Sequence, residues 1–169
     1  MKKLFFILAL TAGSFAANAQ NESADVKPFH ISLGVDAGLP VGDWSDFYSF
    51  AIGGSLKGAY SVADELAITL SAGYLNLSGK TFSGVKVPST GLIPVLAGIK
   101  YNFTPKVFAT AELGSSFGTE KGSGSIFTYA PGIGFNLSDH IDANVRYIGF
   151  SEKGGVSSSL IGLRLAYTF

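Results

Sequence analysis

Residues Leu160–Phe169, at the carboxyl end of the chain, read Leu-Ile-Gly-Leu-Arg-Leu-Ala-Tyr-Thr-Phe. Every second residue of this stretch is large and apolar: Ile161, Leu163, Leu165, Tyr167 and Phe169. The alternate positions are mixed, being Leu160, Gly162, Arg164, Ala166 and Thr168. Successive side chains of a β-strand point to opposite faces of a sheet, so the stretch predicts a strand with one apolar face and one mixed face.

Seven segments upstream show the same period of two. They are Phe29–Leu39, Phe50–Val62, Leu66–Leu77, Leu92–Phe103, Val107–Phe117, Ile126–Leu137 and Ile141–Phe150. A tilted strand of roughly 9–11 residues crosses a bilayer, and each segment is about that long or slightly longer. The more apolar face of these segments is nearly free of charge, whereas the other face is rich in Gly, Ala, Ser and Thr. The sequence therefore predicts an even number of strands, eight, that could face lipid.

The connections between these segments alternate in length. Three are short turns, namely Ser61–Glu65, Thr104–Lys106 and Ser138–His140. Four are longer and rich in Gly, Ser and Lys, namely Pro40–Ser49, Ser78–Gly91, Gly118–Ser125 and Ser151–Ser157. Short turns on one side and long loops on the other are typical of transmembrane β-barrels. A soluble barrel would turn its apolar face inward and would need a polar outer face, which these segments do not offer.

Aromatic residues gather towards both ends of the segments. Near the short turns these are Phe29, Tyr60, Tyr101, Phe103, Phe135 and Tyr167. Near the long loops they are Phe50, Tyr74, Phe117, Phe127 and Tyr129. Two such belts are expected where a barrel wall meets the two membrane–water interfaces.

The amino-terminal residues resemble a secretory signal. Lys2 and Lys3 precede the apolar run Leu4–Leu10, and Ala17-Asn18-Ala19 is a small-residue cleavage motif followed by Gln20. We expect residues 1–19 to be removed between Ala19 and Gln20. Residues 20–28 would then form a periplasmic segment, and residues 29–169 would form the barrel.

The composition excludes several classes of protein. The chain has no Cys, which excludes disulfides and thiolate metal sites, and its formal net charge is zero, which gives no support for nucleic-acid binding. No mature stretch holds about 18 consecutive apolar residues, so a helical membrane span is not expected. No constellation of residues suggests a metal site, a cofactor or a catalytic group.

The mixed face carries seven charged residues that would point into the barrel. They are Asp36, Lys57, Lys100, Glu112, Asp142, Arg146 and Arg164. The interior of an eight-stranded barrel is only about as wide as its own side chains. Charges in such a space are costly unless they are paired, so we expect these three acids and four bases to form a connected network.

Two prolines lie inside predicted strands, Pro94 and Pro131. Proline cannot donate a ladder hydrogen bond. Since Gly132 and Gly134 follow Pro131, we expect a β-bulge there.

The terminal Tyr167-Thr168-Phe169, with Leu165 on the same face, is similar to the assembly signal of outer-membrane barrels. With the eight alternating segments, the chain resembles the small eight-stranded family that includes OmpX and the membrane domain of OmpA. The resemblance covers residues 29–169 and implies an all-β, antiparallel, up-and-down transmembrane β-barrel. It also implies a place in the outer membrane of a Gram-negative-type cell envelope, contact with outer-membrane lipid, and insertion by the barrel assembly machinery. The barrel is expected to be a monomer.

The expected role is non-enzymatic, either structural or in contact with a surface partner through the long loops. Candidate loop contacts are Trp44, Phe47, Tyr48, Lys80, Phe82 and Lys86. Two alternatives stay open, a narrow channel for ions or small solutes and a lipid A-modifying enzyme. Enzymes of that kind resemble this chain in fold and use a His with Ser and an acid. Both histidines, His30 and His140, are expected at the short-turn, periplasmic end, away from outer-leaflet lipid A.

Overall fold

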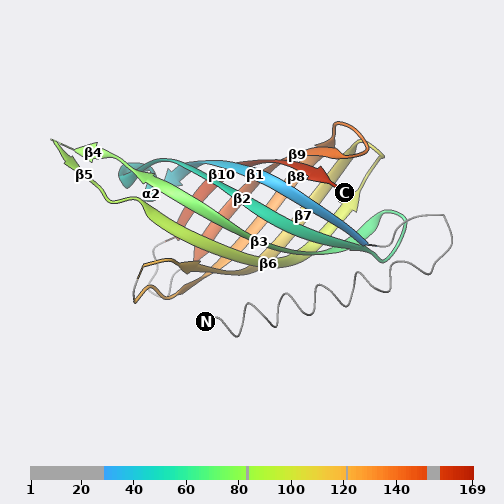
Figure 1. Cartoon of the computed structure of the whole chain (residues 1–169), viewed down its shortest axis with the longest axis horizontal. Coiled ribbons are helices and arrows are strands. Elements are labelled where there is room, and N and C mark those ends of the chain that lie inside the picture. Colours follow the sequence, from blue (N-terminus) through green and yellow to red (C-terminus); the bar gives the residue numbers. More distant parts are fainter. Residues whose placement is uncertain (1–28, 83, 121, 152–156) are drawn as a thin grey trace.

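In the computed structural model, eight long strands close into one antiparallel barrel (Figure 1). The structure describes residues 29–82, 84–120, 122–151 and 157–169. The wall strands are β1 (Phe29–Gly42), β2 (Tyr48–Ser61), β3 (Leu66–Gly79), β6 (Thr90–Asn102), β7 (Val107–Gly118), β8 (Ser125–Asn136), β9 (Ile141–Ser151) and β10 (Ser157–Thr168). The predicted fold class and the eight predicted segments are confirmed. The proposed signal peptide, its cleavage site at Ala19 and Gln20, and residues 20–28 lie outside the described residues.

The first and last strands seal the barrel. β1 pairs with β10 from Ser32↔Thr168 to Gly42↔Ser158, and the strands follow the order β1-β10-β9-β8-β7-β6-β3-β2 around the wall. The backbone N–H of Phe169 adds one more bond, to the carbonyl of Ile31 at 2.9 Å. Closure matters because a sheet edge in hydrocarbon would leave backbone amides without partners.

Two small elements lie at the long-loop end of the barrel. The helix α2 (Trp44–Phe47) follows β1, and the ribbon of β4 (Thr81–Phe82) and β5 (Val85–Lys86) projects beyond the barrel between β3 and β6 (Figure 1). Lys80 ties the two elements together. Its backbone N–H donates to the Phe47 carbonyl at 2.8 Å, and its Nζ donates to the Ser45 carbonyl at 2.6 Å. No helix among the described residues is long and apolar enough to cross a membrane.

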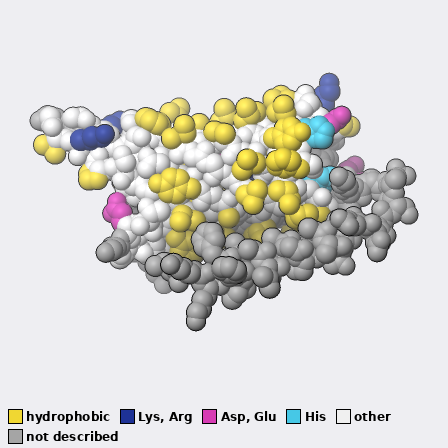
Figure 2. All heavy atoms as spheres, in the orientation of Figure 1, with side chains coloured by type: hydrophobic (Ala, Val, Ile, Leu, Met, Phe, Trp, Pro, Cys, Tyr) yellow, Lys and Arg dark blue, Asp and Glu magenta, His cyan; other side chains and the backbone are white. Residues whose placement is uncertain are grey.

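The two faces of the wall differ sharply in exposure. Outward side chains such as Val35 and Leu70 are 63% and 60% exposed, while the inward Thr69 and Glu112 are each 2% exposed. Apolar side chains are spread over the visible outer surface, and charged ones lie near its two ends (Figure 2). The predicted faces of all eight segments are confirmed. An apolar exterior of this kind is stable against lipid rather than water.

The bulge predicted at Pro131 is wrong. Pro131 pairs with Ala111 of β7 in regular register, and β8 keeps one register with β9 on both sides of the proline. The gap within the β8–β9 ladder covers Ala130 and Pro131 of β8, and the gap within the β3–β6 ladder covers Ile93 and Pro94 of β6. Each proline therefore loses a local ladder bond without the insertion of an extra residue. Among the described strands, a register shift occurs instead in β2, between Tyr48 and Phe50.

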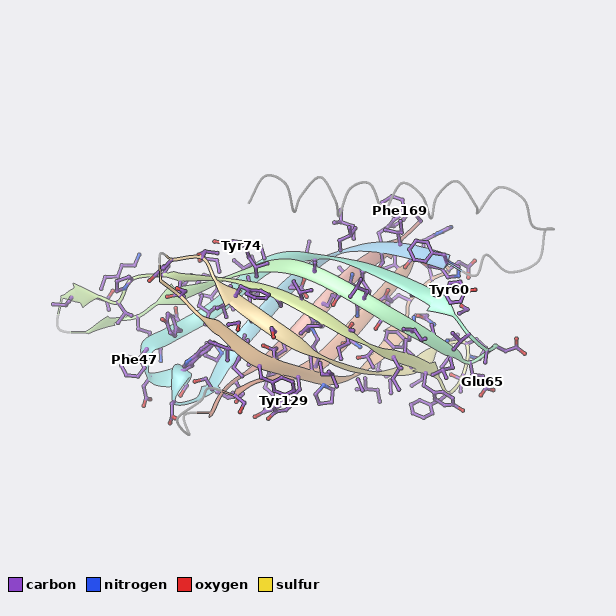
Figure 3. The ribbon with its side chains drawn as sticks, turned by 90° about the horizontal axis from the view of Figure 1, so that it is seen from below. Phe47, Tyr60, Glu65, Tyr74, Tyr129 and Phe169 are labelled. Carbon is purple, nitrogen blue, oxygen red and sulfur yellow. The ribbon has the colours of Figure 1, made fainter. Side chains whose placement is uncertain are left out.

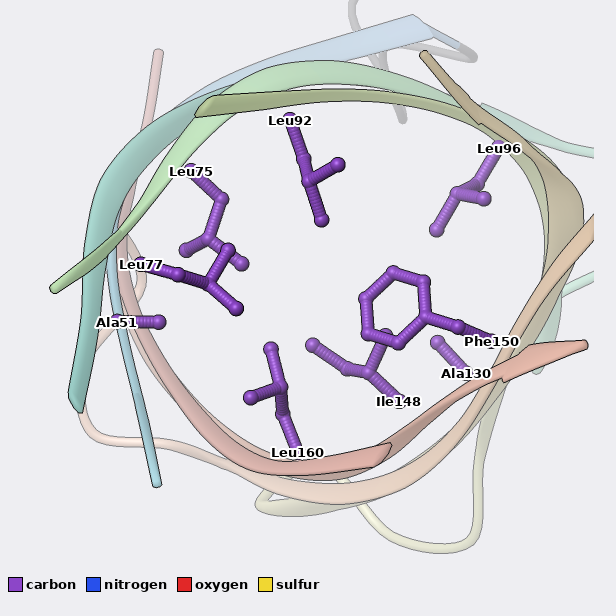
Figure 4. Close-up of a cluster of buried hydrophobic side chains, with 9 residues drawn as sticks. All are labelled: Ala51, Leu75, Leu77, Leu92, Leu96, Ala130, Ile148, Phe150 and Leu160. Atoms are coloured by element: carbon purple, nitrogen blue, oxygen red, sulfur yellow. The ribbon is translucent and has the colours of Figure 1, made fainter. Parts of the chain in front are cut away.

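Large apolar side chains fill the half of the interior near the long loops (Figure 4). This apolar plug consists of Ala51, Leu75, Leu77, Leu92, Leu96, Ala130, Ile148, Phe150 and Leu160. Trp44 of α2 stacks on Phe150 with ring centroids 4.8 Å apart, and Tyr48 packs against the same cluster. Sequence periodicity indicated small or polar inward residues, so the plug was not predicted.

Candidate functional site

The other half of the lumen, towards the short turns, holds the charged side chains. Glu112 of β7 lies at their centre and is 2% exposed. Its Oε1 lies 2.9 Å from Lys57 Nζ, which reaches across the barrel from β2, and it accepts a hydrogen bond of 3.4 Å from the Thr69 hydroxyl. Its Oε2 accepts from Arg146 Nη1 at 3.4 Å. One carboxylate on β7 thus contacts side chains from β2, β3 and β9.

Arg146 of β9 extends this cluster to β1. Its second guanidinium nitrogen, Nη2, is paired with Asp36 Oδ1. The guanidinium is therefore held between two carboxylates, those of Asp36 and Glu112. Its Nε is buried and has no hydrogen-bond partner among the described residues. Breaking such a cluster by removing one member would leave an uncompensated buried charge.

Arg164 of β10 is a second centre and is 2% exposed. Its Nε donates to Ser55 Oγ at 2.9 Å, and its Nη2 donates to Ser32 Oγ at 3.1 Å. Its Nη1 lies 3.9 Å from Asp142 Oδ1, a long ion pair. Asp36 is the register partner of Arg164 on the neighbouring strand, yet its ion pair is with Arg146, one strand farther on.

Lys100 is the inward charge that the structure does not bring to a carboxylate. Within the described residues it makes no ion pair within 4.0 Å. Its Nζ donates a 3.4 Å hydrogen bond to Asn136 Oδ1 and lies 3.9 Å from the centre of the Phe108 ring. A cation above an aromatic face is attracted to it, but this interaction does not neutralise the charge.

Among the described residues, two of the cavities that lie in the lumen have a volume of about 40 Å³ each. The plug cavity lies between the apolar plug and the Asp36–Arg146 pair. The short-turn cavity is lined by Ser32, Lys57, Ala59, Thr69, Lys100, Phe108, Thr110, Asp142, Asn144 and Arg164. A water needs about 10–15 Å³ of such space, so each cavity has room for a few waters or for a small ion.

The expected assembly-signal residues lie on the lipid side of β10. Leu165, Tyr167 and Phe169 are 51%, 47% and 66% exposed, and the last two rings meet edge to face at 5.2 Å. Phe169 and Tyr60 lie towards one end of the barrel, and Tyr74 and Tyr129 towards the other (Figure 3). The aromatic residues therefore occupy both rims of the apolar surface.

The two histidines lie at the short-turn ends of β1 and β9. His140 stacks on Tyr167 at 5.5 Å, and its Nδ1 is 2.9 Å from the Thr168 carbonyl oxygen. His30, the second residue of β1, is half-buried. No group of three or more His, Cys, Asp or Glu side chains in the described part of the chain could hold a metal ion.

Comparison with known families agrees with this geometry. Residues 6–169 match the family described as outer membrane protein beta-barrel domain. The chain belongs to this family. The apolar exterior of this outer-membrane barrel therefore faces lipid, and its expected resemblance to small eight-stranded barrels is confirmed. None of the curated proteins compared with the chain matches it.

Solved structures share the fold of this outer-membrane barrel at low sequence identity. Ail, the attachment invasion locus protein of Yersinia pestis, is 20% identical with a TM-score of 0.58, over 83% of this chain and 97% of Ail. The N-terminal β-barrel domain of Pseudomonas aeruginosa OprF is 15% identical with a TM-score of 0.52, over 82% and 97% of the two chains. A designed transmembrane β-barrel is 15% identical with a TM-score of 0.55, over 86% and 99%.

Proposed function

We propose that this outer-membrane barrel is non-enzymatic, that its lumen is closed to solutes, and that it acts at the surface of a Gram-negative-type envelope through its long loops. The observation that carries the proposal is the filled interior. An apolar plug occupies the long-loop half, and ion-paired side chains occupy the short-turn half. Because the lumen is filled, the long loops are the part of the barrel that is open to a partner. Loops on a rigid scaffold commonly carry binding functions.

The loop surface offers a specific set of contacts. Phe47 of α2 and Val85 of β5 are 53% and 73% exposed. Lys86 beside Val85 adds a charge, which would combine apolar and cationic contacts on the projecting ribbon. Trp44 and Tyr48 are less suitable than the sequence suggested, because both pack against the apolar plug. The side chain of Phe82 lies outside the described part of the structure.

Insertion into the membrane belongs to the same proposal. The Leu165, Tyr167 and Phe169 row would be the signal read by the barrel assembly machinery before the strand enters lipid. A closed wall without an unpaired edge needs no partner subunit, which supports a monomer.

Bilayer recording tests the closed lumen. Purified protein, refolded and reconstituted in a planar bilayer, should give no stable porin-sized conductance steps. Stable steps in the wild-type protein would contradict the proposal and favour the narrow channel. A change in lipid A mass in cells that express the chain would instead contradict the non-enzymatic assignment.

A further inference from the structure

The charges of the lumen do not balance. Four cationic side chains face three carboxylates, so the described interior carries one excess positive charge in the ordinary ionisation states. Glu112 lies 2.9 Å from Lys57, and Asp142 lies 3.9 Å from Arg164. Lys100 has neither partner, although it lines the same cavity as Lys57 and Arg164. A partly buried cation without a carboxylate in direct contact is costly, so this cavity favours a negative ligand.

Hydrogen-bond donors face this short-turn cavity as well. Ser32 Oγ accepts from Arg164 Nη2, and Thr110 Oγ1 accepts from Asn144 Nδ2 at 3.3 Å. Because both oxygens already act as acceptors, the hydroxyl protons of Ser32 and Thr110 can be donated elsewhere. Neither hydroxyl donates to another described residue. The lining thus combines cations with hydroxyl and amide donors.

The size and position of the cavity restrict the ligand. Its volume is about 40 Å³, enough for a small ion and one or two waters. Lys100 and Asp142 are only half-buried and lie near the short turns, where β6 ends and β9 begins. An ion would therefore enter from the short-turn mouth, since the apolar plug fills the opposite half of the lumen.

We propose that the short-turn cavity binds one small monovalent anion of the halide class between Lys57, Lys100 and Arg164, with the hydroxyls of Ser32 and Thr110 as further donors. Asp142 on the same lining and Glu112, which is paired with Lys57, together reduce the net charge of these three cations to one, and this selects against multiply charged anions. The site is independent of the loops and of the proposed surface role. It goes beyond the proposed function by giving the lumen a ligand.

Chloride is the probe. The full barrel is refolded in neutral detergent micelles, and its unfolding by urea is measured in sodium chloride and in sodium gluconate at equal concentration, since gluconate is too large for the cavity. At a chloride concentration ten times its dissociation constant, the folded-to-unfolded ratio should rise about elevenfold. Chloride-35 NMR of the folded protein should show line broadening that bromide reverses.

Lys100→Gln is the decisive variant. It should abolish the chloride effect and the line broadening, while its stability in gluconate should equal or exceed that of the wild type because the excess cation is gone. Lys106→Gln is the matched control, because Lys106 is exposed in the turn after β6 and outside the cavity. The control should keep the full chloride effect.

Three results would overturn the site. Equal stability in chloride and gluconate without line broadening would mean that no halide binds. A chloride effect that persists in Lys100→Gln would put the ion elsewhere. A Lys100→Gln protein that is less stable than wild type in both salts by the same factor would make Lys100 a purely structural residue.

Discussion

Glu112 is the residue on which the ion pairs of the lumen converge. It is the partner of Lys57 from β2 and of Arg146 from β9, and the Thr69 hydroxyl donates to it as well. Glu112 and its cationic partners are buried. If the carboxylate were removed, water could not replace it as the partner of Lys57 and Arg146. The lumen would therefore be sensitive to this one side chain more than to any exposed acid.

We expect Glu112→Ala to lower the free energy of unfolding by about 3–5 kcal/mol, because it leaves Lys57 and Arg146 without this counter-charge. Urea unfolding of the refolded barrel in micelles measures the change. Glu120→Ala, in the exposed loop after β7, is the control and should be neutral. Unchanged stability of the Glu112 variant would mean that these cations are solvated rather than held by the carboxylate.

Leu163 and Gly162 are neighbours on opposite faces of β10. Leu163 is 49% exposed on the lipid side, where an Arg near the bilayer midplane costs about 2–4 kcal/mol. A side chain at Gly162 would face the lumen, with a Cβ 3.1 Å from Ile148 Cδ1, a contact that a small shift relieves. Leu163→Arg should therefore lower stability in lipid vesicles more than Gly162→Ser. Equal losses would count against the assigned faces.

At the scale of the strand, periodicity is the information that the sequence carries most clearly. The alternation of residues such as Leu163 and Arg164 is enough to predict strand positions and faces, because the choice between lipid and lumen repeats every two residues. The strand pattern does not predict which charged side chains pair inside the lumen. Asp36 lies beside Arg164 in register but pairs with Arg146, and this choice depends on side-chain reach across a curved wall.

The strand pattern also failed to predict the apolar plug and the regular register at Pro131. Leu75 and Leu77 sit at inward positions between outward neighbours, and the strand pattern alone does not distinguish a plugged half from a polar one. A proline can lose its ladder bond either through a bulge or through a local gap, and β8 has the gap. Both outcomes depend on how neighbouring strands and side chains fill space.

Phe169, which follows β10, is expected to matter for assembly in the membrane. Phe169 adds one backbone hydrogen bond to Ile31 beyond the β1–β10 ladder, and its ring meets that of Tyr167 edge to face. Deleting Phe169 should reduce the amount of folded protein in the outer membrane more than it reduces the stability of protein refolded in vitro. Heat-modifiable gel mobility of membrane fractions measures the first and urea unfolding the second. Wild-type membrane levels of the truncated chain would argue against its role as an assembly signal.

At the scale of the whole molecule, the arrangement of apolar and charged side chains is the reverse of that in a soluble protein. Apolar side chains cover the outside, and the charged side chains of the lumen, except Lys100, are ion-paired inside. We expect the exported protein to begin at Gln20. Intact-mass measurement of protein from outer membranes tests this, and a mass that includes Met1 would contradict the cleavage.

Between Leu160 and Thr168, odd-numbered residues of β10 face lipid, and even-numbered residues face a filled lumen. Because the chain has no Cys, single-Cys variants along β10 carry one spin label each. In lipid vesicles, collision with dissolved oxygen should be frequent for labels at Ile161, Leu163 and Leu165 and rare at Gly162 and Ala166. A water-soluble nickel relaxant should reach neither set. Collision rates without a period of two, or nickel access at the inward positions, would contradict a lipid-facing barrel with a filled interior.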